Sequence, residues 1–289
     1  MLAHTFQKDD HVYMRTSYLY SSTLMLATLL AACGGGSSSS DSNAAVTPVA
    51  PVTPVNPPAS GDTGGSSAPF ASNANGRYLL LAVASQSSGP LTTVTQGSTG
   101  ALSAIAGTTF TGNPAITREI SGDASFAQGR WFAGTMTGSN GTTVLSGNNA
   151  SAHYTVYKTV AVLPASGSLA CDAGSFTAPS YTGGSVIGQD AYFGTASGSA
   201  TLSFGAAGAA LAMTVDAAAG GSTGRISGAG PASTPAATAI TGAFLGGDSG
   251  TLLALGEGAS AGRYLVIGGY KVTLANGANY QGVATFRCS

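Results

Sequence analysis

Charge is scarce in this 289-residue chain, in which only 7% of the residues are Asp, Glu, Lys or Arg. From residue 71 to the C-terminus there are two lysines, six arginines and seven acidic residues, which leaves a net charge of +1. A protein that binds nucleic acid needs a concentrated basic face to contact the phosphates. The composition therefore excludes nucleic acid as a partner.

Side chains that ligate metals are scarce as well. The chain has three histidines and three cysteines, and His153 is the one histidine after residue 33. The carboxylates are scattered singly along the sequence. Structural and catalytic metal sites bring several such ligands together. We therefore predict no metal site and no cofactor.

A hydrophobic run long enough to cross a membrane is missing near the N-terminus. The uncharged N-terminal segment has its apolar centre at residues 24–30, which is too short for the ~20 apolar residues of a spanning helix. Arg15 precedes it, an arrangement typical of the h-region of a signal peptide. The charged residues 8–10 are unusual in an n-region, which leaves Met1 and Met14 open as the start of the chain.

Residues 30–33, Leu-Ala-Ala-Cys, are followed by three glycines and resemble the lipobox of bacterial lipoproteins. The resemblance implies that residues 1–33 are a lipoprotein signal peptide, with cleavage before a Cys33 that carries lipid and an acylated amine. Several acyl chains make an anchor durable, whereas a single chain holds only marginally. In that family an aspartate after the cysteine retains the protein at the inner membrane, so Gly34 implies the outer membrane. The periplasmic face and the cell surface both remain open. The alternative is an ordinary secretory signal whose cleavage site happens to carry a cysteine.

Residues 34–70 have the composition of a linker. They begin with a flexible Gly/Ser run, and Pro48, Pro51, Pro54 and Pro57 then recur every third residue. This spacing matches the three-residue turn of polyproline II, which rises ~3.1 Å per residue, and predicts a semi-rigid spacer of ~30 Å. The alternative is a ligand for a proline-binding module.

The rest of the chain is rich in glycine, with 43 glycines overall, and its helix propensity is poor nearly throughout. Leu211, Met213 and Val215 alternate with smaller residues, which is the pattern of a half-buried strand. Asn276-Gly277 is a strong signal for a hairpin turn. Similar patterns predict strands at 77–84, 130–137, 142–145, 153–163, 201–204, 211–215, 240–245, 251–255, 263–274 and 279–288.

For residues 71–289 we predict an all-β domain, an antiparallel β-barrel or sandwich of roughly a dozen or more short strands after the linker. Closure of the sheets would remove exposed edges, which few charges are present to protect. One large domain and two small, closely packed ones both remain open.

A second resemblance concerns the β domain. A lipobox, a Gly/Ser/Pro linker and a glycine-rich β domain together are similar to surface lipoproteins of the transferrin-binding-protein-B and factor-H-binding type. The segment 240–246, Ile-Thr-Gly-Ala-Phe-Leu-Gly, resembles the strand that opens their barrels. The Glu-rich segment that usually follows in those families is absent here, so the resemblance implies an architecture and no binding residues.

Cys171 and Cys288 remain once Cys33 is lipidated. Two thiols in an oxidising envelope compartment most simply form one disulfide. Such a bridge would close a loop of more than a hundred residues and tie the middle of the domain to its last strand. We therefore expect residues 71–289 to unfold as one unit. A nucleophilic cysteine is the alternative.

An enzyme of a different kind is suggested by residues 247–250, Gly-Asp-Ser-Gly, which resemble the nucleophile motif of chymotrypsin-like proteases. The resemblance implies Ser249 as nucleophile, His153 as base, and Asp172 or Asp190 as the orienting acid. The surroundings of His153 depart from the family, and the alternative interpretation of residues 247–250 is a polar hairpin turn.

Three further patterns are weaker. Residues 220–224 fit the Gly-x-Ser-x-Gly elbow by chance, since no helix is predicted after them. Four Gly-Arg pairs, at 76, 129, 224 and 262, predict a turn glycine followed by an edge-facing cation rather than an arginine-lined site. Four aromatic residues in strands are expected in the core, with a ligand surface as the alternative: Trp131, Phe132, Tyr154 and Tyr157.

The sequence thus predicts an outer-membrane lipoprotein, anchored through Cys33, whose β domain is non-enzymatic and binds a protein or small molecule or has a structural role. The alternative is a serine hydrolase that uses Ser249 with His153.

Overall fold

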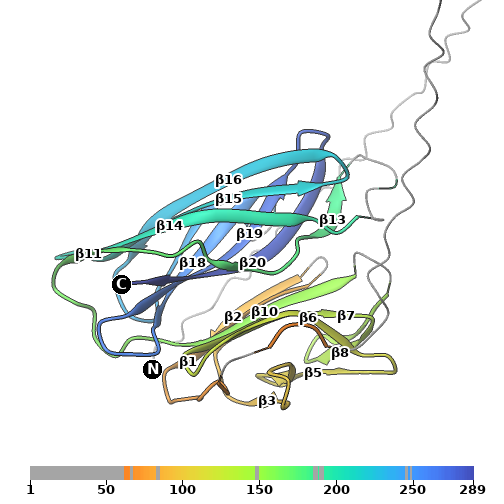
Figure 1. Cartoon of the computed structure of the whole chain (residues 1–289), viewed down its shortest axis with the longest axis horizontal. Coiled ribbons are helices and arrows are strands. Elements are labelled where there is room, and N and C mark those ends of the chain that lie inside the picture. Colours follow the sequence, from red (N-terminus) through yellow and green to blue (C-terminus); the bar gives the residue numbers. More distant parts are fainter. Residues whose placement is uncertain are drawn as a thin grey trace, which may run out of the picture. The chain divides into compact units, whose positions relative to one another are not determined.

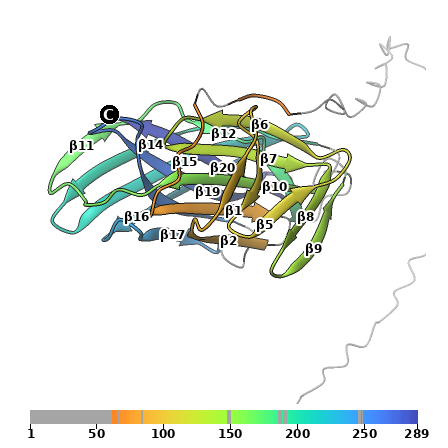
Figure 2. The same cartoon turned by 90° about the horizontal axis from the view of Figure 1, so that it is seen from below.

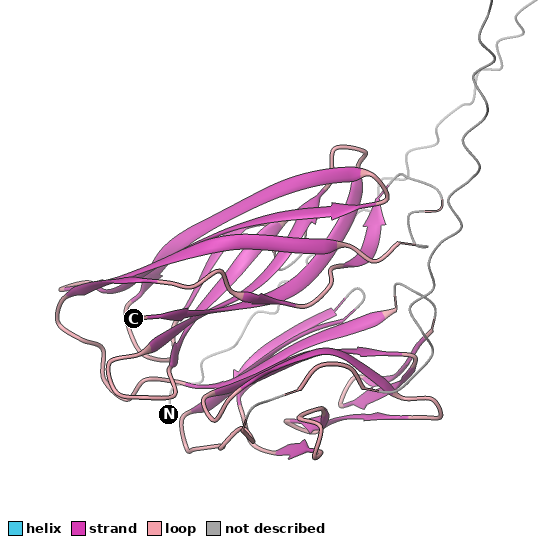
Figure 3. Ribbon diagram, in the orientation of Figure 1, coloured by secondary structure: helices cyan, strands magenta, loops and turns pink. Residues whose placement is uncertain are grey.

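The structure is a computed structural model that describes residues 62–65, 68–82, 85–146, 150–184, 188, 192–244, 247 and 249–289. All regular structure in these ranges is β, with twenty strands and no helix (Figure 3). Every strand pair is antiparallel. The prediction of an all-β antiparallel fold is therefore confirmed.

The N-terminal half of the described chain supplies two five-stranded sheets. The first, here the β10 sheet, has the order β2-β1-β10-β7-β6. Its strands are β1 (Gly76–Ala82), β2 (Ser85–Pro90), β6 (Ile116–Gly122), β7 (Phe126–Phe132) and β10 (Ser151–Lys158). The second, the β5 sheet, contains, in spatial order, β3 (Val94–Gln96), β4 (Leu102–Ile105), β5 (Thr108–Thr111), β8 (Gly134–Gly138) and β9 (Gly141–Leu145).

The C-terminal half supplies two more sheets. The β15 sheet contains, in order, β11 (Gly167–Ala170), β14 (Thr195–Gly205), β15 (Gly208–Ala219) and β16 (Ser222–Ala232). The β19 sheet has the order β12-β20-β19-β18-β17, with β13 also paired to β20. Its strands are β12 (Ser175–Phe176), β13 (Ser180–Gly184), β17 (Thr238–Gly242), β18 (Gly250–Glu257), β19 (Tyr264–Thr273) and β20 (Ala278–Cys288).

The four sheets are stacked as layers, from the β15 sheet through the β19 and β10 sheets to the β5 sheet (Figures 1 and 2). The largest core cluster joins the first two layers, for example through Met213 and Tyr270. Two small clusters join the β19 and β10 sheets, one around Leu79 and Val283 and one around Phe126 and Ile267. A fourth cluster, which contains Trp131, lies between the β10 and β5 sheets. The β19 and β10 sheets are therefore covered on both faces.

This layering explains the two kinds of strand in the sequence. Strands β18 and β20 bury every residue except Glu257 and Arg287, because both of their faces meet another sheet. Strand β15 buries every second residue, because its other face meets solvent. The alternation of Leu211, Met213 and Val215 is confirmed as the pattern of an outer strand.

Glycine-containing turns place the long strands. The predicted hairpin of β14 and β15 is present, with its turn at 205–208, and Asn276-Gly277 lies in the turn between β19 and β20. Gly220 and Gly221 form a two-residue connection between β15 and β16 with φ of 55° and 78°. Two positive φ angles in a two-residue loop are what a type I′ hairpin needs. The match of 220–224 to a nucleophile elbow is therefore a hairpin turn followed by a strand.

Several predicted strands have different limits, and the one expected at 240–245 ends at Gly242. The expected strand at 130–137 is two strands, because Ala133 adopts φ 54° and directs the chain from β7 in the β10 sheet to β8 in the β5 sheet. The expected strand at 153–163 ends at Lys158. Residues 83, 84 and 245, at the ends of predicted strands, lie outside the described residues.

The described part of the chain begins at residue 62, inside the predicted linker of residues 34–70. Gly64 forms a parallel bridge to Ile120 in β6, and the Ile120 amide donates a 3.0 Å hydrogen bond to the Thr63 carbonyl. Phe70 is buried in the cluster between the β10 and β5 sheets. The end of the predicted linker thus packs on the domain, whereas Cys33 and the linker up to residue 61 lie outside the described residues.

The predicted disulfide between Cys171 and Cys288 is present. It joins residues 117 positions apart, with the two Cα atoms 3.9 Å from each other. Cys171 directly follows β11 in the β15 sheet, and Cys288 ends β20 in the β19 sheet, so the bridge connects the first two layers. Both cysteines belong to the C-terminal half.

We expect Cys171→Ser to lower the melting temperature by several degrees. The bridge removes loop-closure entropy from the unfolded chain, which for a loop of this length is worth about 4–5 kcal/mol in the chain-entropy model. Thermal unfolding followed by circular dichroism, with and without reductant, measures the effect. A wild-type protein that titrates with two free thiols, or a variant that melts like the oxidised wild type, would contradict it.

Candidate functional site

His153, the candidate base, lies in the middle of β10 on the face that meets the C-terminal half, and its side chain is fully buried. Its Nδ1 is 2.8 Å from the hydroxyl of Thr177, and its Nε2 is 2.7 Å from the hydroxyl of Ser180. Thr177 is itself fixed to β20, because its hydroxyl accepts a 3.1 Å hydrogen bond from the Val283 amide. His153 therefore links the β10 sheet to the β12–β13 segment of the β19 sheet.

The candidate nucleophile and the candidate acids do not contact His153 in the described structure. Ser249 precedes β18, and its carbonyl accepts a hydrogen bond from the Ala243 amide. Since Thr177 and Ser180 occupy both ring nitrogens, neither nitrogen is left to act as a base for Ser249. The carboxylate of Asp172 accepts a hydrogen bond from the Arg287 amide, and Asp190 lies outside the described residues. The structure does not assemble the predicted triad.

Ser180 and His153 do have the spacing of a nucleophile and its base. Ser180, His153 and Thr177 are all fully buried, however, so a substrate has no access to them. The position where a triad has a carboxylate is occupied by the neutral hydroxyl of Thr177. The arrangement acts as an internal hydrogen-bonded link.

Arg130 lies opposite His153 on β7, and its side chain is only 2% exposed. Its guanidinium makes two 2.7 Å hydrogen bonds to the carboxylate of Glu119 and a third, of 3.2 Å, to the hydroxyl of Ser151. The ring of Phe193 lies 4.2 Å from the guanidinium carbon. A bidentate partner and a ring contact are what a buried guanidinium requires.

Glu119 reaches Arg130 because of a bulge in β6. The register between β6 and β7 shifts between Arg118 and Ser121, and Glu119 adopts φ 49°. A bulge of this kind changes the direction of a side chain relative to its strand. The interpretation of Gly129-Arg130 as a turn followed by an edge cation is therefore wrong. Gly129 lies inside β7, where the ring of Tyr154 covers its Cα.

The electrostatics of this cluster keep His153 neutral. Burial, and secondly the charge of Arg130, hold the pKa of His153 well below 6.5. The cluster thus contains one compensated ion pair, a neutral imidazole and the hydroxyls of Ser151, Thr177 and Ser180. Sequence reasoning missed Glu119, Thr177 and Ser180, because a bulge and contacts between sheets leave no mark in the local pattern.

The predicted aromatic residues are mostly core. Trp131, Tyr154 and Tyr157 are buried, and the indole of Trp131 donates a 2.7 Å hydrogen bond to the Leu102 carbonyl. Burial raises the pKa of Tyr157 to about 12. Phe132 is partly exposed and packs edge-to-face on Phe193. Trp131, Tyr154 and Tyr157 are therefore core residues, as predicted, and these three rings form no ligand surface.

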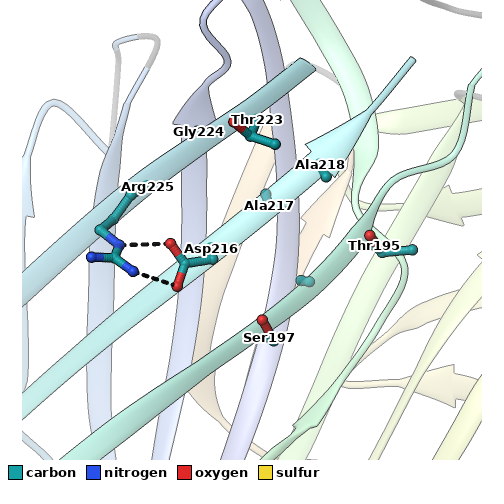
Figure 4. A pocket seen from close by; sticks show the side chains of 9 residues that line it. Thr195, Ser197, Asp216, Ala217, Ala218, Thr223, Gly224 and Arg225 are labelled. Atoms are coloured by element: carbon teal, nitrogen blue, oxygen red, sulfur yellow. Dashed lines mark hydrogen bonds and ion pairs between the residues drawn. The ribbon is translucent and has the colours of Figure 1, made fainter. Parts of the chain in front are cut away.

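A groove of about 430 Å³ lies across β14, β15 and β16 (Figure 4). Ala218 lies between Thr195 and Thr223 on the neighbouring strands, and these short side chains leave the groove shallow. In the next row Arg225 and Asp216 form an exposed bidentate ion pair with distances of 2.6 and 2.9 Å. Because each charge already has its partner, the groove presents no unpaired charge to a ligand.

No three His, Cys, Asp or Glu side chains gather into a possible metal site within the described ranges. The same ranges contain no helix with the length and apolar character needed to cross a membrane. No family model, curated protein or solved structure matches this chain.

The pKa of His153 predicts a loss of stability in mild acid. The unfolded chain binds a proton on this histidine below about pH 6.5, whereas the folded protein does so only at much lower pH. Stability should therefore fall as the pH drops from 7 to 5, by up to about 2 kcal/mol. Urea unfolding at several pH values measures this slope.

His153→Gln is the matched variant, because an amide can also donate one hydrogen bond and accept another without taking up a proton. It should lose much less stability between pH 7 and 5 than the wild type. Equal slopes for the two proteins would show that His153 is not the group responsible.

Proposed function

We propose that this protein is a lipoprotein anchored in the outer membrane through Cys33, with a non-enzymatic β domain that binds a partner or has a structural role in the cell envelope. The observation that carries the proposal is the motif Leu-Ala-Ala-Cys at 30–33, placed directly after a short apolar segment. Gly34 supports the outer membrane as destination, by the sorting rule of the family that the motif resembles.

The disulfide supports export from the cytoplasm. Cys171 and Cys288 are bonded, and disulfides persist in oxidising compartments such as the periplasm or the cell surface. The bridge uses two of the three cysteines in the sequence, and the third, Cys33, lies outside the described residues. An anchoring role for Cys33 is in keeping with that distribution.

The linker supports a tethered domain. The prolines from 48 to 57 would hold a polyproline spacer, and the chain after it joins the domain at β6 through Thr63 and Gly64. A spacer of this kind separates a folded body from a bilayer. The partner would be a protein or a small molecule, and the low basic charge argues against nucleic acid.

A non-enzymatic role is supported by the surroundings of the candidate base. His153 is buried with both ring nitrogens bonded, and Arg130 is neutralised by Glu119. General acid–base catalysis needs a titratable group that can reach the substrate proton. Neither group offers that.

Metabolic labelling with a palmitate analogue tests the anchor. We expect the wild-type protein to be labelled and to fractionate with the outer membrane, and Cys33→Ala to be unlabelled. Cys171→Ser serves as the control, because it also removes one cysteine but leaves the lipobox intact. A wild-type protein without label would overturn the anchor.

The second candidate function, a serine hydrolase, rests on the motif at 247–250 and is tested with a fluorophosphonate probe. We expect no labelling of the full-length protein at neutral pH. Ser249→Ala and Ser180→Ala separate the two serines that the motif and the contact with His153 single out. Labelling of the wild type that either substitution abolishes would replace the binding role with a hydrolase.

A further inference from the structure

A second groove, of about 350 Å³, lies where the β10 and β5 sheets meet at one side. Its walls come from β1 and the edge strand β2 on one side, and from the β4–β5 turn and the β8–β9 hairpin on the other. Pockets for small ligands commonly have volumes of about 300–1,000 Å³. The groove is thus large enough for one small molecule or for the end of a larger one.

The lining of this groove carries no Asp, Glu, Lys, Arg or His side chain. It combines hydroxyl groups, as in Ser87 and Thr143, with the amide of Asn140. An aromatic ring, Tyr78, and apolar side chains including Met136 complete it.

This chemistry restricts the ligand. An ion would lose its hydration without meeting an opposite charge, which is costly. A purely apolar ligand would leave the amide of Asn140 and the hydroxyls of the groove unpaired, at about 1–3 kcal/mol for each buried group. A neutral molecule with many hydroxyl groups avoids both costs, and its C–H surfaces can pack on the ring of Tyr78.

The groove also lies on a sheet face rather than along a sheet edge. Ser87 is paired with Leu80, and Ser85 with Ala82, so the side chains of these serines share the face of Leu80, which packs toward the β5 sheet. A peptide that added a strand to β2 would pair with the outer backbone edge instead. The position therefore favours recognition through side chains over strand addition.

We propose that this groove binds a neutral saccharide, either a monosaccharide or the terminal unit of a glycan. The inference deepens the binding role proposed above and rests on it, but it does not depend on the lipid anchor. The lining without charges further implies that binding is insensitive to salt, because no ion pair is there to be screened.

Saturation-transfer-difference NMR on the full-length protein tests the proposal, with methyl glucoside, methyl galactoside, N-acetylglucosamine and N-acetylgalactosamine as probes. At least one should receive saturation, with the same affinity in 50 and 500 mM NaCl. Thr143→Trp, in the wall of the groove, should weaken binding at least about tenfold. Thr142→Trp is the matched control, because Thr142 is an exposed neighbour on the same strand outside the groove and should bind as the wild type does.

The proposal is overturned if none of the four saccharides receives saturation, or if Thr143→Trp and Thr142→Trp bind equally well. An uncharged decapeptide that shifts the backbone resonances of β2 while the saccharides do not bind would show strand addition instead. None of these results depends on Cys33. Failure of the palmitate labelling and failure of saccharide binding are thus separate outcomes.

Discussion

The burial of two sheets on both faces is the constraint on which the rest of the structure depends. The β19 sheet lies between the β15 and β10 sheets, and the β10 sheet lies between the β19 and β5 sheets. A strand in such a sheet must be apolar on both sides or bring a partner for each polar group. Strand β20 is mostly of the first kind. In β10 both ring nitrogens of His153 have partners, whereas the buried hydroxyl of Thr155 has none among the described residues. The outer sheets are released from this requirement, and the solvent face of β14 carries short polar side chains such as Ser197, Ser199 and Thr201.

The same constraint decides where chemistry can occur. The groups that resemble catalytic residues, His153 and Arg130, lie in the internal layers, where their hydrogen bonds connect strands and no substrate reaches them. Only the outer layers and their margins meet other molecules. The groove beside β2 lies at such a margin, and its uncharged lining reflects the composition of the whole chain. The binding function that we propose would therefore use the periphery of the stack.

Local patterns in the sequence predicted the parts of the fold that local physics determines. The alternation from Leu211 to Val215 and the Asn276-Gly277 turn each specify a hairpin without help from the rest of the chain. The disulfide followed from having two cysteines to pair. The split at Ala133, the bulge at Glu119 and the burial of Arg130 did not, because each depends on a sheet formed by residues far away in the sequence. For the same reason Thr177 and Ser180 could not be recognised as the partners of His153.

The contacts between the β19 and β10 sheets should make the four layers a single cooperative body. Differential scanning calorimetry of the oxidised full-length protein measures this cooperativity. We expect a single transition whose calorimetric enthalpy equals its van't Hoff enthalpy. Two transitions, one for the strands β1–β10 and one for β11–β20, would contradict it.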